Sequence, residues 1–111
     1  ESVPLFVIKK DGSRQAFNRQ KLIERILRAC QKRAVSMADI NALADEIESA
    51  ILNTPHRELS TKDIGDRVLR GLWRIDEVAY VRFASIYQEF DSLETFINAI
   101  KEIKKQRRSK G

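Results

Sequence analysis

VIKKDGSRQAFNRQK, residues 7–21, is the stretch that decides how this chain begins to fold. Two strand-like segments, residues 5–9 and 14–17, flank the dipeptide Asp11-Gly12. Asp-Gly between strands favours a tight hairpin, because glycine adopts positive φ without a Cβ clash. Asn18 follows as a helix N-cap, since its side-chain oxygen accepts a hydrogen bond from an orphan backbone N–H. The stretch therefore predicts a hairpin that leads through a cap into a helix.

Four basic residues, Lys9, Lys10, Arg14 and Lys21, lie close to this helix start. A helix N-terminus already carries partial positive charge, so the region suits the phosphates of a nucleotide. Lys21 in the first turn opposes the helix dipole, a local conflict that a bound anion would offset. A simpler interpretation stays open: lysines on an edge strand discourage aggregation. Because side chains alternate along a strand, at most one of Lys9 and Lys10 faces a ligand from the sheet.

Length and composition predict one soluble globular domain. The chain has 111 residues, 42% hydrophobic and 33% charged, which argues against disorder. It contains no apolar run near the roughly 20 residues that span a bilayer, and no signal-peptide pattern, so we expect no membrane partner. Cys30 is the single cysteine, which excludes an internal disulfide and fits a cytoplasmic location. Because it begins at Glu1 without a methionine, we interpret the chain as a fragment of a longer protein.

The charge is concentrated at the C-terminal end. Residues 101–111, KEIKKQRRSKG, hold six Lys/Arg and one Glu, and this equals the +5 net charge of the whole chain. We therefore divide the chain into a lead-in (1–4), a nearly neutral domain (5–100) and a basic tail (101–111). Two interpretations of the tail stay open: a solvated helix end, or a nonspecific contact with nucleic acid phosphates.

Apolar residues at helical spacing predict four or five helices after the hairpin. The first runs from Arg19 to about Lys32, with Cys30 as a small core residue, and the second follows the cap Ser36 to about Asn53. Residues 57–59 form a possible third strand. The remaining helices are expected to begin after Ser60 or Thr61, after Asp76, and after a capping box at residues 91–94. The fold class is therefore α+β: a β-hairpin or three-stranded cap on a bundle of four to five helices.

The motifs of catalysis are missing from the sequence. It has no Cys/His cluster for zinc, no GxxxxGK[ST] loop and no GxGxxG. Its single histidine, His56, follows Pro55 in a predicted turn, so a Ser/His/Asp arrangement is not credible. We therefore expect a binding or regulatory domain and not an enzyme.

Two stretches resemble a known family. Residues 7–12, VIKKDG, followed by Phe17-Asn18 and Lys21, resemble the ATP-cone, a nucleotide-binding regulatory domain. Residues 76–87, DEVAYVRFASIY, with Phe90 after them, are similar to the NrdR-type transcriptional repressors of ribonucleotide reductase genes. The resemblance covers nearly all of residues 5–98.

The resemblance implies that ATP and dATP bind under the cap. It places Lys9 and Lys10 on the phosphates, with Asn18 and Lys21 completing that side. The remaining implied contacts are the backbone of Val7 and Ile8, Phe17 and Leu22 against the base, Thr61 on the adenine edge, and Gln15 on ribose or base. Gln15 stands where the motif usually has Glu, so the site loses one negative charge. Tyr87 is implied less directly and is also interpreted as a core residue.

The resemblance also implies a switch in which ATP and dATP favour different homo-oligomers, and only one of these binds reductase promoters. Residues 78–90 and the last helix would carry the subunit contacts. Repressors of this family read DNA with an N-terminal zinc ribbon of four cysteines, which this chain lacks. We therefore expect no specific DNA binding by this chain alone, and zinc only in such a ribbon. Magnesium could accompany the triphosphate of the nucleotide, although no carboxylate of the chain is assigned to it.

Two alternatives remain at this point. One is an allosteric ATP-cone from a ribonucleotide reductase large subunit; residues 79–87, AYVRFASIY, and the basic end argue against it. The other is a small basic DNA-binding or interaction module driven by the tail, which would show no nucleotide affinity and a steep salt dependence on DNA. Neither the number of nucleotides bound nor the oligomer formed with each follows from the sequence.

Overall fold

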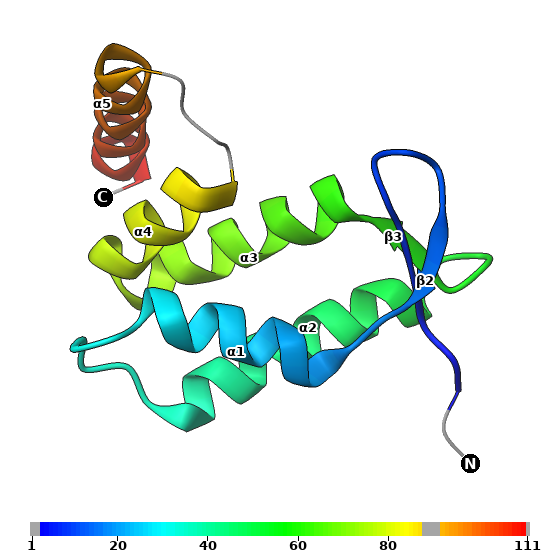
Figure 1. Cartoon of the computed structure of the whole chain (residues 1–111). Helices are drawn as coiled ribbons and strands as arrows, with labels where there is room; N and C mark the ends of the chain where they lie inside the picture. Colours follow the sequence, from blue (N-terminus) through cyan, green and yellow to red (C-terminus); the bar gives the residue numbers. More distant parts are fainter. Residues whose placement is uncertain (1–2, 88–91, 111) are drawn as a thin grey trace.

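The computed structural model describes residues 3–87 and 92–110. It confirms the α+β prediction, with a small sheet at one end of a helical body (Figure 1). The elements, in chain order, are β1 (Phe6–Ile8), β2 (Arg14–Ala16), α1 (Arg19–Ala29), α2 (Met37–Leu52), β3 (Glu58–Ser60), α3 (Thr61–Ile75), α4 (Glu77–Tyr87) and α5 (Leu93–Lys110).

The predicted hairpin forms at the Asp-Gly dipeptide. The Lys9 N–H donates to the Ser13 carbonyl at 2.8 Å, and the Gly12 N–H donates to the Lys9 carbonyl at 2.9 Å. Gly12 has φ +87°, so the turn uses the left-handed conformation that glycine adopts most easily. The Asp11 carboxylate accepts the Ser13 N–H at 2.9 Å, which further stabilises the turn. The local chemistry of the turn therefore sets the register of β1 and β2.

The third strand is also present, displaced by one residue from the predicted 57–59. β3 pairs parallel to β1, with Val7 opposite Leu59, so the strand order is β2-β1-β3. β1 pairs antiparallel to β2, with Val7 opposite Gln15. Val7 therefore lies in the middle strand, between Gln15 of the same hairpin and Leu59, which is distant in sequence.

Four helices begin at caps expected from the sequence. In each, a cap side chain accepts the N–H three residues later. The pairs are Asn18 with Lys21, Ser36 with Asp39, Ser60 with Asp63 and Asp76 with Ala79.

Two boundaries differ from prediction. The first helix ends at Ala29 and not at about Lys32, because the chain turns at Lys32, whose φ is +61°. For α5 we expected a capping box beginning at Asp91, which lies outside the described residues. In the structure Ser92 accepts the Thr95 N–H at 3.1 Å. α5 then continues through the proposed boundary at 100/101 to Lys110, so much of the basic tail is helical.

The core lies mainly between α1, α2 and α3, and Ala79 of α4 is also fully buried in it. Its largest fully buried side chains are Ile26, Ile40, Ile47, Ile51, Val68 and Leu72. Cys30 is 6% exposed and burial raises the pKa of its thiol, which confirms its assignment as a core residue. None of the helices that the structure describes has the length and apolar character needed to cross a membrane.

Candidate functional site

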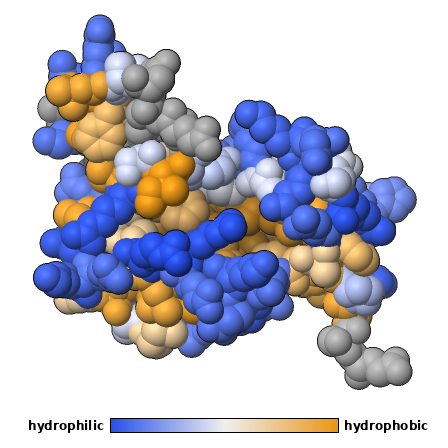
Figure 2. Space-filling model, in the orientation of Figure 1, coloured by the Kyte–Doolittle hydropathy of each residue, from blue (hydrophilic) through white to orange (hydrophobic). Residues whose placement is uncertain are grey.

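A cavity of about 280 Å³ opens between the hairpin and the helices α1, α3 and α4. In Figure 2, hydrophobic surface lies in a hollow between the hydrophilic hairpin and the hydrophilic face of the helical body. Val7 and Gln15 lie on the same face of the sheet, because they are paired across β1 and β2. Lys9 follows β1 directly, two residues after Val7, and lines the cavity with them. The lining residues are Val7, Lys9, Gln15, Ala16, Phe17, Asn18, Lys21, Leu22, Arg25, Thr61, Ile64, Gly65, Val68, Phe83 and Tyr87.

One side of the cavity is cationic. Lys9 from the hairpin and Lys21 and Arg25 from α1 line it, and the described lining includes no carboxylate. Lys21 and Arg25 are four residues apart, so they share one face of α1. The first turn of α1 has no acidic residue, so its N-terminal partial charge adds to theirs. The charge arrangement suits a polyanion such as a phosphate chain.

Most of the remaining lining residues are apolar. Phe17 and Leu22 lie close to the hairpin end, while Ile64, Val68 and Phe83 come from α3 and α4. A pocket of this kind, with a few polar groups such as Thr61 and Gln15 at its edge, suits a flat ring system that is anchored by a small number of hydrogen bonds.

Tyr87 forms part of the wall between α3 and α4. Its ring packs directly on Gly65: a Cβ at residue 65 would lie 2.2 Å from Cζ of the ring. The hydroxyl donates to the Lys62 carbonyl at 2.8 Å, and burial raises the pKa of this phenol. The Phe83 ring centroid lies 6.0 Å away. The Tyr87 side chain is therefore held in place by contacts with α3 and with Phe83 of its own helix, α4.

The cationic wall continues beyond this cavity. A neighbouring cavity of about 450 Å³ shares Arg25 with the first and adds Arg28 and Arg82. Arg82 is anchored because its guanidinium donates to the Gln31 carbonyl at 2.6 Å. The positive charge around the site therefore comes from both α1 and α4.

The structure brings together eight of the ten site residues expected from the sequence: Val7, Lys9, Gln15, Phe17, Asn18, Lys21, Leu22 and Thr61. Ile8 is outside the lining, because neighbouring residues of a strand face opposite sides. Lys10 is exposed in the hairpin turn and is also outside it.

Arg14 was grouped with the basic residues near the helix start, but it lies on the other face of the sheet. Its guanidinium stacks over the Phe6 ring at 3.6 Å from the centroid. It also pairs with Glu58 at 3.6 Å and donates to the His56 carbonyl at 3.3 Å. Arg14 is therefore engaged away from the cavity.

Several lining residues were missed by sequence reasoning. Arg25 carried a usable signal, because it follows Lys21 at the i+4 spacing of one helix face. Ala16 lies in the hairpin itself, at the end of β2. The others come from helices that meet the hairpin only after folding: Ile64, Gly65, Val68 and Phe83. No local spacing connects α4 with the hairpin, so Phe83 had no sequence signal for this role.

The fold and the cavity define a small α+β ligand-binding domain, in which a sheet closes one end of a helical body and cations face an apolar pocket. The sequence pattern of the ATP cone domain family matches residues 5–93. Curated relatives named "Transcriptional repressor NrdR" align over nearly the whole chain. The relative from Acetivibrio thermocellus is 52% identical over 93% of this chain and 68% of its own length. The relative from Solibacter usitatus is 43% identical over 98% of this chain and 71% of its own length. The relative from Caldicellulosiruptor bescii is 45% identical over 93% of this chain and 67% of its own length. The chain therefore belongs to the ATP-cone family and, within it, to the NrdR repressors.

Proposed function

We propose that this chain senses ATP and dATP on behalf of a transcriptional repressor of ribonucleotide reductase genes. The observation that carries the proposal is the cavity, in which cations from the hairpin and α1 face an apolar pocket. A nucleotide has the matching parts, a polyanionic chain at one end and a flat base at the other. The domain acts by binding and is regulatory, not enzymatic, in keeping with the repressor name of its relatives.

Each residue has a proposed role in this site. Lys9 and Lys21 contact phosphates next to the capped start of α1, and Lys10 reaches the phosphate chain from the turn. The backbone of Val7 and Ile8 lies beside the nucleotide. The remaining proposed contacts are Asn18 on the phosphate side, Phe17 and Leu22 on the base, Thr61 on the adenine edge and Gln15 on ribose or base. Magnesium would enter with the triphosphate, because the described lining supplies no carboxylate for it.

The proposed output is a change of assembly. A ligand shifts an equilibrium between two assemblies only by its difference in affinity for them. ATP and dATP differ by one hydroxyl, so the two nucleotides would favour different homo-oligomers. In the full-length repressor, dATP would favour the oligomer that binds DNA at reductase promoters. α4 and α5 would carry the subunit contacts; Phe90, included in the expected contact region, lies outside the described residues.

Calorimetric titration with ATP, dATP and GTP tests the site. We expect saturable binding that selects adenine, and a loss of affinity of about tenfold or more in Lys9→Ala, as for one charged hydrogen bond to phosphate. Lys10→Ala removes the same charge one residue away and tests the second proposed phosphate contact. We expect a smaller loss there, because Lys10 lies outside the cavity lining. No binding of either adenine nucleotide, or an unchanged affinity in Lys9→Ala, would contradict the proposed site.

Deletion of residues 104–111 separates this function from that of a tail-driven DNA-binding module. A nucleotide sensor keeps its ATP affinity without those residues. A module that depends on the basic tail would instead lose binding to DNA and would show no nucleotide affinity at any stage.

A further inference from the structure

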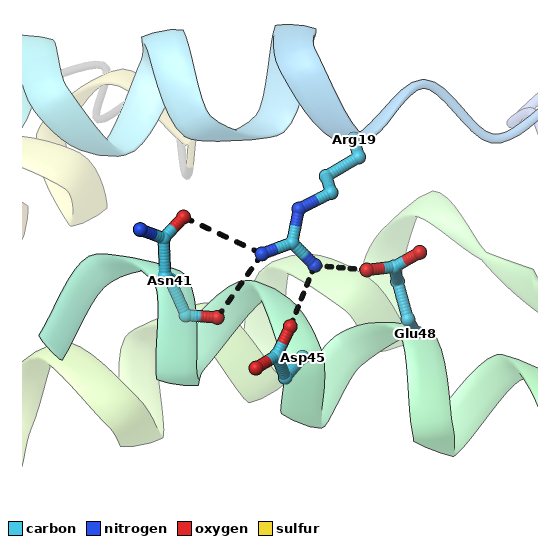
Figure 3. Close-up of polar contacts among 4 residues, drawn as sticks. All are labelled: Arg19, Asn41, Asp45 and Glu48. Atoms are coloured by element: carbon cyan, nitrogen blue, oxygen red, sulfur yellow. Dashed lines mark hydrogen bonds and ion pairs between the residues drawn. The ribbon is translucent and has the colours of Figure 1, made fainter. Parts of the chain in front are cut away.

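Arg19, the first residue of α1, reaches from α1 to α2 (Figure 3). Its Nη1 donates to Asp45 Oδ1 at 2.7 Å and also to the Glu48 carboxylate. Its Nη2 donates to the backbone carbonyl and the side-chain oxygen of Asn41, each at 3.4 Å. Asn41, Asp45 and Glu48 follow the i, i+4, i+7 spacing of one helix face, so a single stripe of α2 receives the guanidinium.

This contact differs from an ordinary surface ion pair. The side chains of Arg19 and Glu48 are 33% and 35% exposed, so solvent screens them less than it screens fully exposed charges. The hydrogen bonds to Asp45 and Glu48 raise the pKa of Arg19. Among the described residues, no other ion pair joins α1 to α2.

The position of α1's first turns matters to the cavity. Asn18, Lys21, Leu22 and Arg25 all line it, and all lie within the cap and the first two turns of α1. These residues move together, because a helix is stiff over so short a length. On one side the chain is fixed by the Phe17 N–H, which donates to the Leu5 carbonyl at 2.8 Å. On the other side Arg19 joins the same turn to α2.

We propose that Arg19 is a positioning residue for the nucleotide site: through Asp45 and Glu48 it holds the first turn of α1 where Asn18 and Lys21 meet the phosphates. This inference rests on the proposed nucleotide function. Arg19 does not line the cavity, and its charge is already neutralised by α2, so it acts through Asn18 and Lys21 and not on the ligand.

A variant that loses a carboxylate of α2 shows whether Arg19 acts by holding α1 in place or by attracting the ligand through its charge. Replacing Arg19 itself would weaken binding on either account, because a cation near an anion site would be lost. Glu48→Gln instead removes a negative charge, and long-range electrostatics alone then predicts tighter binding of a polyanion. Positioning predicts the opposite, because Arg19 loses one of its two ionic partners.

The experiment compares ATP affinities by calorimetry, at a temperature where circular dichroism shows each variant fully folded. Differences in global stability between the variants then do not change the measured ATP affinity. Glu46→Gln is the matched control: Glu46 lies on the same helix and pairs with an arginine, but that arginine is Arg74 of α3, at 3.2 Å. We expect ATP affinity to fall about threefold to tenfold in Glu48→Gln, and to stay equal or rise in Glu46→Gln.

Asp45→Asn is a second variant, because Asp45 is 70% exposed and its replacement is tolerated most easily by the fold. We expect it to weaken ATP binding in the same direction, and the double variant to weaken it further. Affinities in Glu48→Gln and Asp45→Asn that match or exceed that of Glu46→Gln would overturn the positioning role alone. A wild-type chain without ATP binding, or one insensitive to Lys9→Ala, would overturn the proposed function as well.

Discussion

Gly65 and Tyr87 show how a single residue shapes the site. The Tyr87 ring occupies the space that a side chain at residue 65 would need, with ring atoms 2.2 and 2.3 Å from an ideal Cβ. Because the ring also lines the cavity, the absence of a side chain at Gly65 allows α3 and α4 to form this wall together. The contact depends on the approach of two helices and not on a special backbone conformation of the glycine.

Gly65→Ala should therefore force the Tyr87 ring out of place and lower the free energy of unfolding by about 1–3 kcal/mol, as in other overpacked sites. Urea unfolding measures this change. In a Tyr87→Ala background the clash is absent, and the same substitution should stabilise the protein by up to about 1 kcal/mol through the higher helix propensity of alanine. An equal loss in both backgrounds would show that the ring does not determine the cost.

At the scale of elements, the start of α4 is fixed by one carboxylate that serves two purposes. Asp76 accepts the Ala79 N–H at 2.9 Å as the N-cap, and it pairs with Arg33 through bonds of 2.9 and 3.1 Å. Arg33 belongs to the loop between α1 and α2, so this pair connects that loop with α4. The Asp76 side chain is only 15% exposed.

The bonds from Arg33 lower the pKa of Asp76 below its ordinary value of 3.8. The folded state therefore binds the proton less readily than the unfolded state. The resulting stability is present in full above that ordinary value, and is lost as pH falls through 3.8 toward the lower folded-state pKa.

Asp76→Asn keeps a good cap but removes the charge, so it should lower the melting temperature at neutral pH. The difference in melting temperature between wild type and variant should narrow as pH falls below 3.8, because Asp76 is protonated first in the unfolded state and, at still lower pH, in the folded state as well. Thermal unfolding across this range measures the difference. A difference that stays constant with pH would show that Arg33 contributes little through charge.

At the scale of the whole molecule, apolar surface remains uncovered at one end. Ile86 near the end of α4 and Leu93 at the start of α5 are each 72% exposed, and Ile97 is 40% exposed. A last helix of this kind has two conceivable roles, closing the bundle or covering a second subunit. Exposed side chains of this size near the chain end agree better with an intermolecular contact.

Ile86→Asp and Leu93→Asp should therefore reduce nucleotide-dependent assembly, because a charge in an apolar interface is costly. Size-exclusion chromatography with ATP and with dATP measures the assembly, and calorimetry shows whether ATP binding survives. Leu52→Asp is the control, since Leu52 is also exposed, at 48%, but lies at the end of α2. Profiles that do not change between the two nucleotides would contradict the proposed switch.

Much of the fold was predictable because it depends on neighbours in sequence. The Asp11-Gly12 turn, the cap at Asn18 and the caps at Ser36 and Asp76 each rest on bonds between residues two to three apart. The end of α1 was not predictable in this way. Apolar spacing continued past Ala29 to Cys30, whereas the chain leaves the helix there and takes a positive φ at Lys32, a residue type that does not favour this conformation.

The sequence by itself determined the hairpin, the helix starts and the basic residues near the start of α1, and its resemblance to the ATP-cone indicated eight of the lining residues, six of them between Val7 and Lys21. Only the tertiary structure decided which elements complete the cavity, because α3 and α4 meet the hairpin across more than 40 residues of chain. It also placed Lys9 and not Lys10 in the lining, and directed Arg14 to the opposite face of the sheet. The reason is physical: caps and turns are short-range interactions, whereas a cavity wall and the Arg19 contact with α2 form only when distant helices pack.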